Sequence, residues 1–219
     1  MSARVSAQTV PPAGFRLWPG RLSPEEQAEL VRAVLALAEA APFMRQVTPG
    51  GRPMSVEMTS LGPLGWITDA NGYRYSTVHP RTGQPWPPMP QALLDLWREV
   101  ADGSTPPDSC LVNLYRDDAR MGLHQDRDEA DFAFPVLSVS LGDTAIFRIG
   151  DPRRRSPTAS IRLASGDVCL LSGEARLAFH GVDRILRGSS LLIPGGGRIN
   201  LTLRRAAPRP TLACAGGSD

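Results

Sequence analysis

The chain has 219 residues, a formal net charge of +2 and 42% hydrophobic residues, which is ordinary usage for a globular protein. This length is enough for one domain with a substantial core. No apolar run is long enough for a membrane helix, and the first residues lack the hydrophobic region of a signal peptide. We therefore expect a cytoplasmic protein that does not enter a membrane.

The cysteine and arginine content narrows the possible classes further. Cys110, Cys169 and Cys214 are odd in number and far apart, which argues against a disulfide framework and against a thiolate zinc site. All 24 basic residues are arginine. A genome rich in G and C produces the same bias, so it is weak evidence for phosphate binding, although guanidinium groups suit phosphate chemically.

The N-terminal part predicts a strand followed by a helix. We expect residues 1–14 to be a flexible leader and residues 15–18 to form a first strand. Ser23-Pro24-Glu25-Glu26 supplies an N-cap, a proline at the first helical position and an acid three residues after the cap, which together predict the start of a helix. The helix should end before Pro42, because proline disfavours helical geometry in the preceding residue.

The segment over residues 43–90 is rich in Gly, Pro, Thr and Tyr, and its short alternating pieces predict strands between turns. A second helix is predicted over residues 90–101, with Gly103 as its terminator. Its apolar stripe comprises Leu93, Leu94, Trp97 and Val100.

After Pro107 the sequence changes to short β-rich runs separated by turns. The predicted strands cover residues 110–115, 136–141, 144–149, 160–163, 167–171 and 199–205. This spacing favours a sandwich or jelly roll. We therefore predict an α+β fold that is mainly β, with the helices confined to the N-terminal part and a flexible tail over residues 206–219.

His124-Gln125-Asp126 is a candidate metal motif. On a strand, side chains alternate between faces, so a histidine and a carboxylate separated by one residue would point to the same side. With His180 they would form two imidazoles and one carboxylate, the facial triad that suits non-haem Fe(II). The alternative is that the pair is solvated in a loop and that His180 is satisfied by local hydrogen bonds.

The run after His180 is a second candidate site. On a strand, Arg198, Asn200, Thr202 and Arg204 would share one side, and the residues between them are apolar. Two guanidinium groups on one side could grip the two carboxylates of a diacid. The alternative is an edge strand whose arginines point to water.

These stretches also carry a resemblance to a known family. The chain resembles the bacterial AlkB family of Fe(II)- and 2-oxoglutarate-dependent dioxygenases, which reverse alkylation damage to nucleic-acid bases. The resemblance spans residues 15–205. The matching motifs are Val47-Thr48-Pro49-Gly50-Gly51, Met54-Ser55-Val56, Leu64-Gly65-Trp66, Tyr73-Arg74-Tyr75, Pro85-Trp86-Pro87, Asn113-Leu114-Tyr115, Leu123-His124-Gln125-Asp126-Arg127-Asp128-Glu129, Val139-Ser140-Leu141-Gly142, His180-Gly181-Val182 and Arg198-Ile199-Asn200-Leu201-Thr202-Leu203-Arg204.

The resemblance implies roles for individual residues. The implied iron ligands are His124, Asp126 and His180. The implied 2-oxoglutarate contacts are Arg198, Tyr115 and Asn200 at the distal carboxylate, and Asn113 and Arg204 near the carboxylate that chelates the metal. The implied contacts to the damaged base and its nucleotide are Trp66, Tyr73, Arg74, Tyr75, Asp128 and Arg154.

Two of the implied base contacts suggest how a cationic lesion is held. Trp66 and Tyr73 could sandwich the ring by stacking and cation–π attraction. Asp128 could continue the alternation of His124 and Asp126 along one strand, from the metal to the base. Trp18 and Trp97 are instead expected in the core.

The resemblance implies a double-stranded β-helix (jelly roll) in a single dioxygenase domain over residues 15–205. Residues 15–107 would form the N-terminal extension and nucleotide-recognition lid, and residues 108–205 the catalytic core. The implied activity is oxidative demethylation of 1-methyladenine and 3-methylcytosine with Fe(II), 2-oxoglutarate and O2, releasing formaldehyde, succinate and CO2. The expected partner is alkylated single- or double-stranded DNA, with RNA as a further candidate, and we expect a monomer.

Nucleic-acid binding should involve a local basic patch, because the chain as a whole is only slightly basic. The candidate residues are Arg52, Arg74, Arg127 and the run Arg153-Arg154-Arg155. Two other hypotheses remain open: a 2-oxoglutarate oxygenase that acts on a protein or a small molecule, and a jelly-roll binding module without catalysis.

Overall fold

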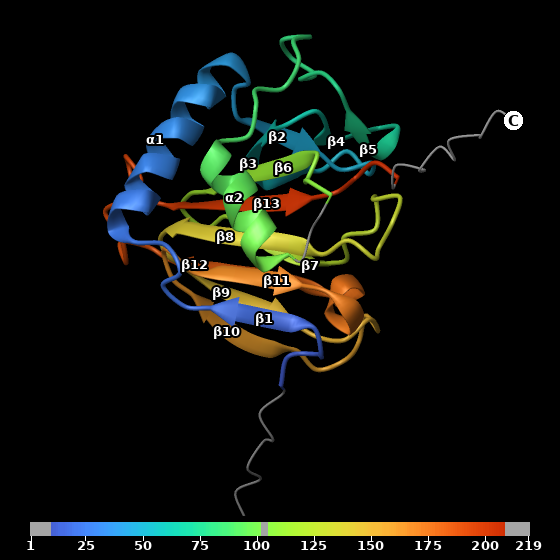
Figure 1. The fold of residues 1–219 in the computed structure, drawn as a ribbon. Helices are drawn as coiled ribbons and strands as arrows, with labels where there is room; N and C mark the ends of the chain where they lie inside the picture. Colours follow the sequence, from blue (N-terminus) through green and yellow to red (C-terminus); the bar gives the residue numbers. More distant parts are fainter. Residues whose placement is uncertain (1–9, 102–104, 209–219) are drawn as a thin grey trace, which may run out of the picture.

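Two antiparallel sheets form the frame of the fold in the computed structural model, which describes residues 10–101 and 105–208 (Figure 1). The larger sheet has the order β1 (Phe15–Trp18), β11 (Val168–Leu171), β8 (Val136–Gly142), β13 (Arg198–Arg204), β6 (Ser109–Tyr115), β3 (Pro53–Leu61) and β2 (Met44–Val47). The smaller sheet has the order β10 (Ala159–Leu163), β9 (Thr144–Ile149), β12 (His180–Leu186) and β7 (Met121–His124).

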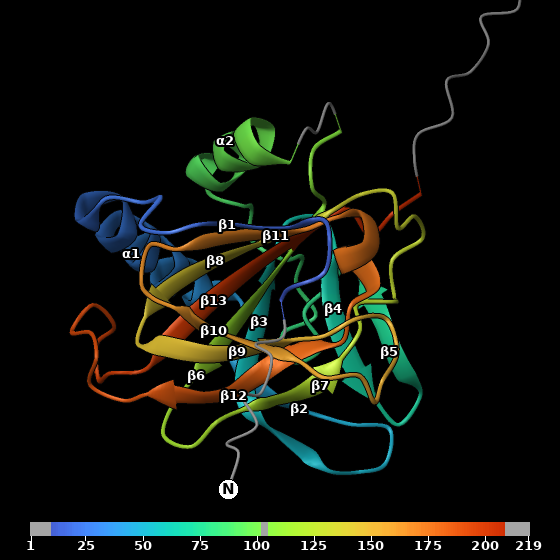
Figure 2. The ribbon, with the colours of Figure 1, turned by 90° about the horizontal axis from the view of Figure 1, so that it is seen from below.

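The described fold also contains a small hairpin and a 3₁₀ turn. β4 (Gly65–Asp69) and β5 (Gly72–Ser76) form a separate hairpin, and a 3₁₀ turn spans Gly173–Leu177 just before β12. The two large sheets face each other across a layer of buried side chains, and the hairpin lies at one end of the pair (Figure 2). The mainly β, jelly-roll architecture predicted from the sequence is confirmed.

Both helices lie where the sequence predicted them. α1 (Pro24–Ala40) begins with a capping box, in which Glu26 N donates to Ser23 Oγ at 3.2 Å and Ser23 N donates to Glu26 Oε2 at 2.7 Å. These two bonds satisfy amide groups that the first helical turn leaves unpaired. α2 spans Gln91–Val100. Gly103, its predicted terminator, lies outside the described residues.

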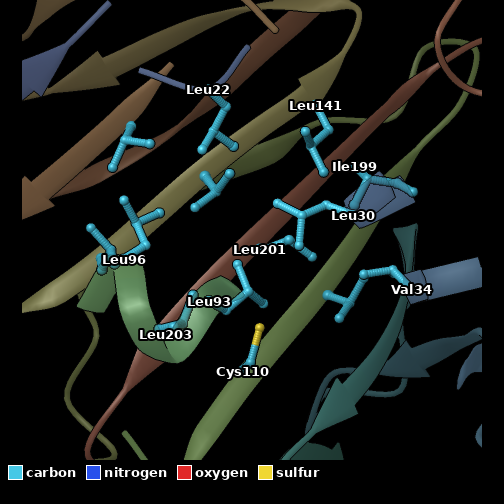
Figure 3. Close-up of a cluster of buried hydrophobic side chains, with 14 of the residues drawn as sticks. Leu22, Leu30, Val34, Leu93, Leu96, Cys110, Leu141, Ile199, Leu201 and Leu203 are labelled. Atoms are coloured by element: carbon cyan, nitrogen blue, oxygen red, sulfur yellow. The ribbon is translucent and has the colours of Figure 1, made fainter. Parts of the chain in front are cut away.

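The main hydrophobic core lies between the two helices and the outer face of the larger sheet (Figure 3). β13 shows how the alternation of the sequence produces it, because Ile199, Leu201 and Leu203 are fully buried there against Leu93 and Val34 of the two helices. Trp97 is also fully buried in this core and Trp18 packs against it, as the sequence predicted.

The opposite face of β13 looks into the space between the sheets. β13 lies between β6 and β8, with Asn200 opposite both Asn113 and Ser140. Its alternate residues, Arg198 to Arg204 at every second position, therefore face the smaller sheet from the centre of the larger one. A central strand of this kind is rigid, since both of its edges are hydrogen-bonded.

The strand predicted to carry both metal ligands is shorter than expected. β7 ends at His124, so Asp126 and Asp128 lie in the connection that follows and not on the strand. The prediction that a single strand carries all three residues is therefore wrong. Asp126 needs other contacts to hold it beside the histidines.

Backbone contacts extend past the predicted domain boundaries at residues 15 and 205. Ser172 N donates to Gly14 O at 3.1 Å, and Ala206 N donates to Asp108 Oδ1 at 2.6 Å. The other residues of the predicted leader and tail, up to 9 and from 209, lie outside the described part. Within the described part, neither helix is long and apolar enough to span a membrane.

The core role of β13 predicts a large difference between two identical substitutions. Leu201→Ala should lower the free energy of unfolding by about 3–5 kcal/mol, because it opens a cavity in a fully buried site. Leu191→Ala is the matched control, since Leu191 is 98% exposed and its loss should change stability by less than about 0.5 kcal/mol. Urea denaturation followed by circular dichroism measures both, and equal midpoints would contradict this account of the core.

Candidate active site

A cavity of about 270 Å³ opens between the two sheets beside the β4–β5 hairpin. Its lining combines a polar set from β13 and the β7 connection with an apolar set from the sheet interiors. The sequence-predicted residues that line it are Trp66, Tyr73, Asn113, Tyr115, His124, Asp126, Asp128, His180, Arg198, Asn200 and Arg204. The fold therefore brings both candidate sites of the sequence into one cavity.

His124, Asp126 and His180 meet at one point of this cavity. One ligand atom from each of them lies within 4.8 Å of the others. His124 Nε2 is 3.6 Å from Asp126 Oδ1, and His180 Nε2 is 3.9 Å from Asp126 Oδ2. His124 and His180 are opposite each other on paired strands, β7 and β12. Two imidazoles and a carboxylate in this arrangement form the facial triad that suits Fe(II).

Backbone carbonyl groups fix the histidine tautomers. His124 Nδ1 lies 2.9 Å from Gly122 O, and His180 Nδ1 lies 2.9 Å from Ala178 O. A carbonyl only accepts, so each Nδ1 carries the proton and each Nε2 is left with a lone pair for a metal. Burial and the nearby His124 lower the pKa of His180 to about 4, which keeps that ring neutral at pH 7.

Asp126 is held by buried arginines. Its Oδ2 accepts from Arg204 Nη2 at 2.9 Å and from Arg204 Nε at 3.2 Å, and its backbone carbonyl accepts from Arg176 Nη1 at 2.8 Å. Burial alone would raise the pKa of Asp126, but the positive charge of Arg204, with that of Arg176, outweighs burial and lowers that pKa well below its usual range. The carboxylate is thus ionised and oriented without any strand register to hold it.

Arg198 lies at the closed end of the cavity and is 1% exposed. Its Nη2 donates to Ser140 Oγ at 2.8 Å, but its Nε has no hydrogen-bond partner among the described residues, and neither has Asn113 Oδ1. Burial lowers the pKa of Arg198, and its guanidinium remains the charged group at this end. A buried donor without a partner is costly, so this end of the cavity fits a carboxylate-bearing ligand.

Two neighbours of Arg198 complete a polar end. Burial raises the pKa of Tyr115 to about 12, so its hydroxyl is a neutral donor. Asn200 Nδ2 donates to Ser138 Oγ at 2.7 Å, and Asn200 Oδ1 accepts from Thr202 Oγ1 at 3.0 Å. The expectation that both arginines of β13 grip a diacid needs a refinement, because Arg204 is already paired with Asp126.

The β4–β5 hairpin brings aromatic side chains to the cavity mouth. Trp66 and Tyr73 stack on each other with ring centres 5.5 Å apart and planes 17° apart. A base between two parallel rings needs about 7 Å between their centres. The rings must therefore separate to admit one, and the predicted sandwich stays a prediction. Trp66 Nε1 also donates to Asp128 Oδ2 at 2.7 Å, which fixes this carboxylate at the mouth.

Three of the predicted base contacts lie outside the cavity lining. Arg74 is paired with Asp69 across the hairpin, with Nη2 to Oδ2 at 2.6 Å, and Arg154 is exposed in the β9–β10 loop. Tyr75 points inward, and its hydroxyl donates to Glu129 Oε1 at 2.5 Å. Burial raises the pKa of Tyr75, so this hydroxyl keeps its proton.

Glu129 and Arg176 are site residues to which the sequence analysis assigned no role. They form an ion pair, Arg176 Nη2 to Glu129 Oε2 at 2.9 Å, with side chains at most 3% exposed. Glu129 thus contacts the hairpin through Tyr75, while Arg176 holds the carbonyl of Asp126. Glu129 is the last residue of the matching motif around Asp126, and this position could have indicated a role in the site. Arg176 lies outside every matching motif, so nothing in the sequence indicated its role.

Comparison with known proteins identifies the class of this fold and site. A family model of the 2OG-Fe(II) oxygenase superfamily matches residues 14–204. The chain belongs to this superfamily, which uses Fe(II), 2-oxoglutarate as a co-substrate and O2 as the oxidant. The triad and the unpaired polar groups around Arg198 fit that set.

Individual relatives narrow the family. The chain is 71% identical over 193 residues to an alpha-ketoglutarate-dependent dioxygenase AlkB homolog of Caulobacter vibrioides, covering 88% of each chain. It is 42% identical to alpha-ketoglutarate-dependent dioxygenase AlkB of Escherichia coli, covering 83% of this chain and 85% of that one. A solved structure titled "The structure of OsALKBH1" matches with a TM-score of 0.71 and 31% identity, over 90% of this chain and 99% of that one. The chain belongs to the AlkB family of dioxygenases, so the hypothesis of a binding module without catalysis is wrong.

The triad geometry predicts the effect of removing one ligand. His180→Gln should weaken Mn²⁺ binding by more than about 100-fold, because it removes one of three protein ligands. Isothermal titration calorimetry without O2 measures the affinity. His79→Gln is the matched control, since His79 is buried elsewhere with Nε2 3.0 Å from Pro42 O, and it should bind Mn²⁺ as the wild type does. Equal affinity in the two variants would exclude His180 as a ligand.

Proposed function

We propose that this dioxygenase oxidatively demethylates N-alkylated bases, such as 1-methyladenine and 3-methylcytosine, in DNA and also in RNA. The observation that carries the proposal is one cavity that joins three elements: the His124-Asp126-His180 triad, a buried guanidinium at the closed end, and an aromatic hairpin at the mouth. Membership of the AlkB family supports the substrate class, because that family reverses alkylation damage.

The closed end of the cavity would hold 2-oxoglutarate. Arg198 would bind its distal carboxylate, with Tyr115 and Asn200 beside it, and Asn113 and Arg204 would lie near the carboxylate that chelates the metal. His124, Asp126 and His180 would hold Fe(II) through Nε2, a carboxylate oxygen and Nε2. When bound, Fe(II) with 2-oxoglutarate and O2 supplies the oxidant that inserts one oxygen atom into a methyl C–H bond, and 2-oxoglutarate leaves as succinate and CO2.

The mouth of the cavity would hold the lesion. A methylated base that cannot pair costs less to unstack and flip than a paired base, which favours damaged nucleotides. Trp66 and Tyr73 would stack against the cationic ring, and Asp128 would place a carboxylate beside it. Tyr75, Arg74 and Arg154 would contact the base or its nucleotide from the hairpin and the β9–β10 loop.

The last step, the release of formaldehyde, does not involve the metal. In the hydroxymethyl product the C–N bond breaks, its electron pair stays on the ring nitrogen, the hydroxyl proton leaves to solvent, and formaldehyde departs. For a base that was cationic this step restores a neutral base that can pair. The wall of the cavity needs only to hold the methyl group toward the triad.

The decisive assay uses an oligonucleotide with a single 3-methylcytosine or 1-methyladenine. With Fe(II), ascorbate and 2-oxoglutarate, the wild type should release formaldehyde and the oligonucleotide should lose one methyl group by mass. Asp126→Ala should show no activity above background, because it removes a metal ligand. Activity of this variant equal to the wild type would refute the catalytic proposal. Consumption of 2-oxoglutarate without demethylation would point instead to a protein or small-molecule substrate.

The role of Arg198 predicts a separate kinetic effect. Arg198→Gln should raise the KM for 2-oxoglutarate by about 10–100-fold, because a charge-assisted pair of hydrogen bonds is lost. Its affinity for Mn²⁺ should remain close to that of the wild type, since Arg198 does not touch the triad. Arg98→Gln, on the exposed side of α2, is the matched control. An unchanged KM in Arg198→Gln would exclude the binding of the distal carboxylate of 2-oxoglutarate by Arg198.

A further inference from the structure

The outer face of the smaller sheet carries three arginines on adjoining strands. Arg162 of β10 and Arg184 of β12 are both opposite Ile146 of β9. The side chains of Arg162, Ile146 and Arg184 therefore point to the same face of the sheet. Arg148 lies two residues further along β9 and shares that face. Asp183 is the single acid in the four strands of this sheet, and it lies where the β12 register shifts.

Within the described part of the chain this face is open to solvent, unlike its counterpart on the larger sheet. The inward residues of the same strands, such as Phe147, Ala145 and Leu163, are buried between the sheets. Arg162 and Arg184 are exposed, and α1 and α2 lie over the other sheet (Figure 2). The arginines therefore form a charged surface that packing does not need.

The charges of the molecule are divided between its two sides. Four of the five charged residues of α1 are glutamates, and α2 carries two acids and one arginine. The small sheet and the β9–β10 loop carry more arginines than acids, and Arg153, Arg154 and Arg155 are exposed in the loop. In a chain with a net charge of only +2, this division would orient a polyanion toward the small sheet.

The β9–β10 loop connects this surface with the active site. Gln125, which lies between His124 and Asp126, donates from Nε2 to Pro152 O at 3.3 Å. Asp151 O accepts from Phe179 N at 3.1 Å, immediately before His180. The loop thus starts beside the metal ligands. Along β9, away from the loop, Arg148 comes first, and Ile146, which lies between Arg162 and Arg184, comes next.

We propose that the outer face of the small sheet, with Arg148, Arg162 and Arg184, is a second contact surface for the phosphate backbone of nucleic acid that flanks the target nucleotide. The proposal rests on the proposed function. Arg162 and Arg184 are two strands apart, about 10 Å, and Arg148 is about 7 Å further along. Guanidinium groups bind phosphate oxygens bidentately and stay charged at all relevant pH values.

The present partners of these arginines leave them available. Arg184 Nη1 pairs with Asp183 Oδ2 at 2.6 Å, with side chains 63% and 42% exposed, and such a surface pair is weak enough to exchange for a phosphate. Arg148 Nε donates to Thr158 Oγ1 at 2.8 Å, a neutral acceptor that keeps the guanidinium on the side of β10. No acid faces Arg162 directly across the sheet, where its partner is Ile146.

The test compares short and long substrates. Single-stranded oligonucleotides of 5 and 25 nucleotides, each with one central 3-methylcytosine, are assayed for demethylation and for binding between 50 and 300 mM salt. The double variant Arg162→Gln/Arg184→Gln should bind the 25-mer about 10-fold more weakly at low salt, and its salt dependence should become shallower by roughly one to two in slope. Its affinity and kcat for the 5-mer should match the wild type, because a short strand does not reach this face.

Arg32→Gln/Arg98→Gln, on the two helices, is the matched control and should behave as the wild type with both substrates. Thermal midpoints of both double variants confirm that the fold is retained. If the wild type demethylates the 5-mer but Arg162→Gln/Arg184→Gln binds the 25-mer with unchanged affinity and salt slope, the second contact surface is refuted and the proposed function stands. If the wild type demethylates neither oligonucleotide, the proposed function fails, and this surface has no role in it.

Discussion

The ion pair between Arg204 and Asp126 is the interaction on which the site depends. Asp126 lies beyond the end of β7, where no sheet register places its side chain, and it is buried. A buried carboxylate is costly unless it is paired and hydrogen-bonded. Arg204 supplies both conditions with two hydrogen bonds, and Arg176 holds the adjoining carbonyl. Removal of one partner would leave an uncompensated charge inside the fold.

β13 carries that ion pair because it is central to the larger sheet. One face of the strand is the floor of the main core, and the other presents Arg198, Asn200 and Arg204 to the cavity. The same backbone register therefore fixes the hydrophobic packing and the spacing between the two guanidinium groups. A shift of one residue would bury the arginines in the core and expose the leucines to the cavity. Stability and chemistry are thus coupled in a single strand.

The β4–β5 hairpin is tied by two contacts to the segment that follows Asp126. Trp66 bonds Asp128 and Tyr75 bonds Glu129, and both acids follow Asp126 within three residues. A movement of the hairpin that admits a base would therefore act on the segment next to the metal ligand. The Arg176–Glu129 ion pair opposes that movement, because Arg176 is itself anchored by a hydrogen bond from its Nε to Phe134 O at 2.8 Å. In the proposed function, entry of a base at the hairpin would therefore be coupled to the geometry of the metal site.

The sequence by itself determined the elements that local chemistry specifies. The capping residues around Ser23 set the start of α1, and the alternation after Arg198 set both faces of β13, since each depends on neighbouring residues alone. The matching motifs around His124, His180 and Arg198 pointed to the family and to most of the polar residues that line the cavity. Only the tertiary structure decided that Asp126 lies off the strand, that Trp66 and Tyr73 contact each other, and that Arg176 meets Glu129. The geometry of these features depends on how the sheets and the hairpin pack, and Arg176 and Glu129 are 47 residues apart in the sequence.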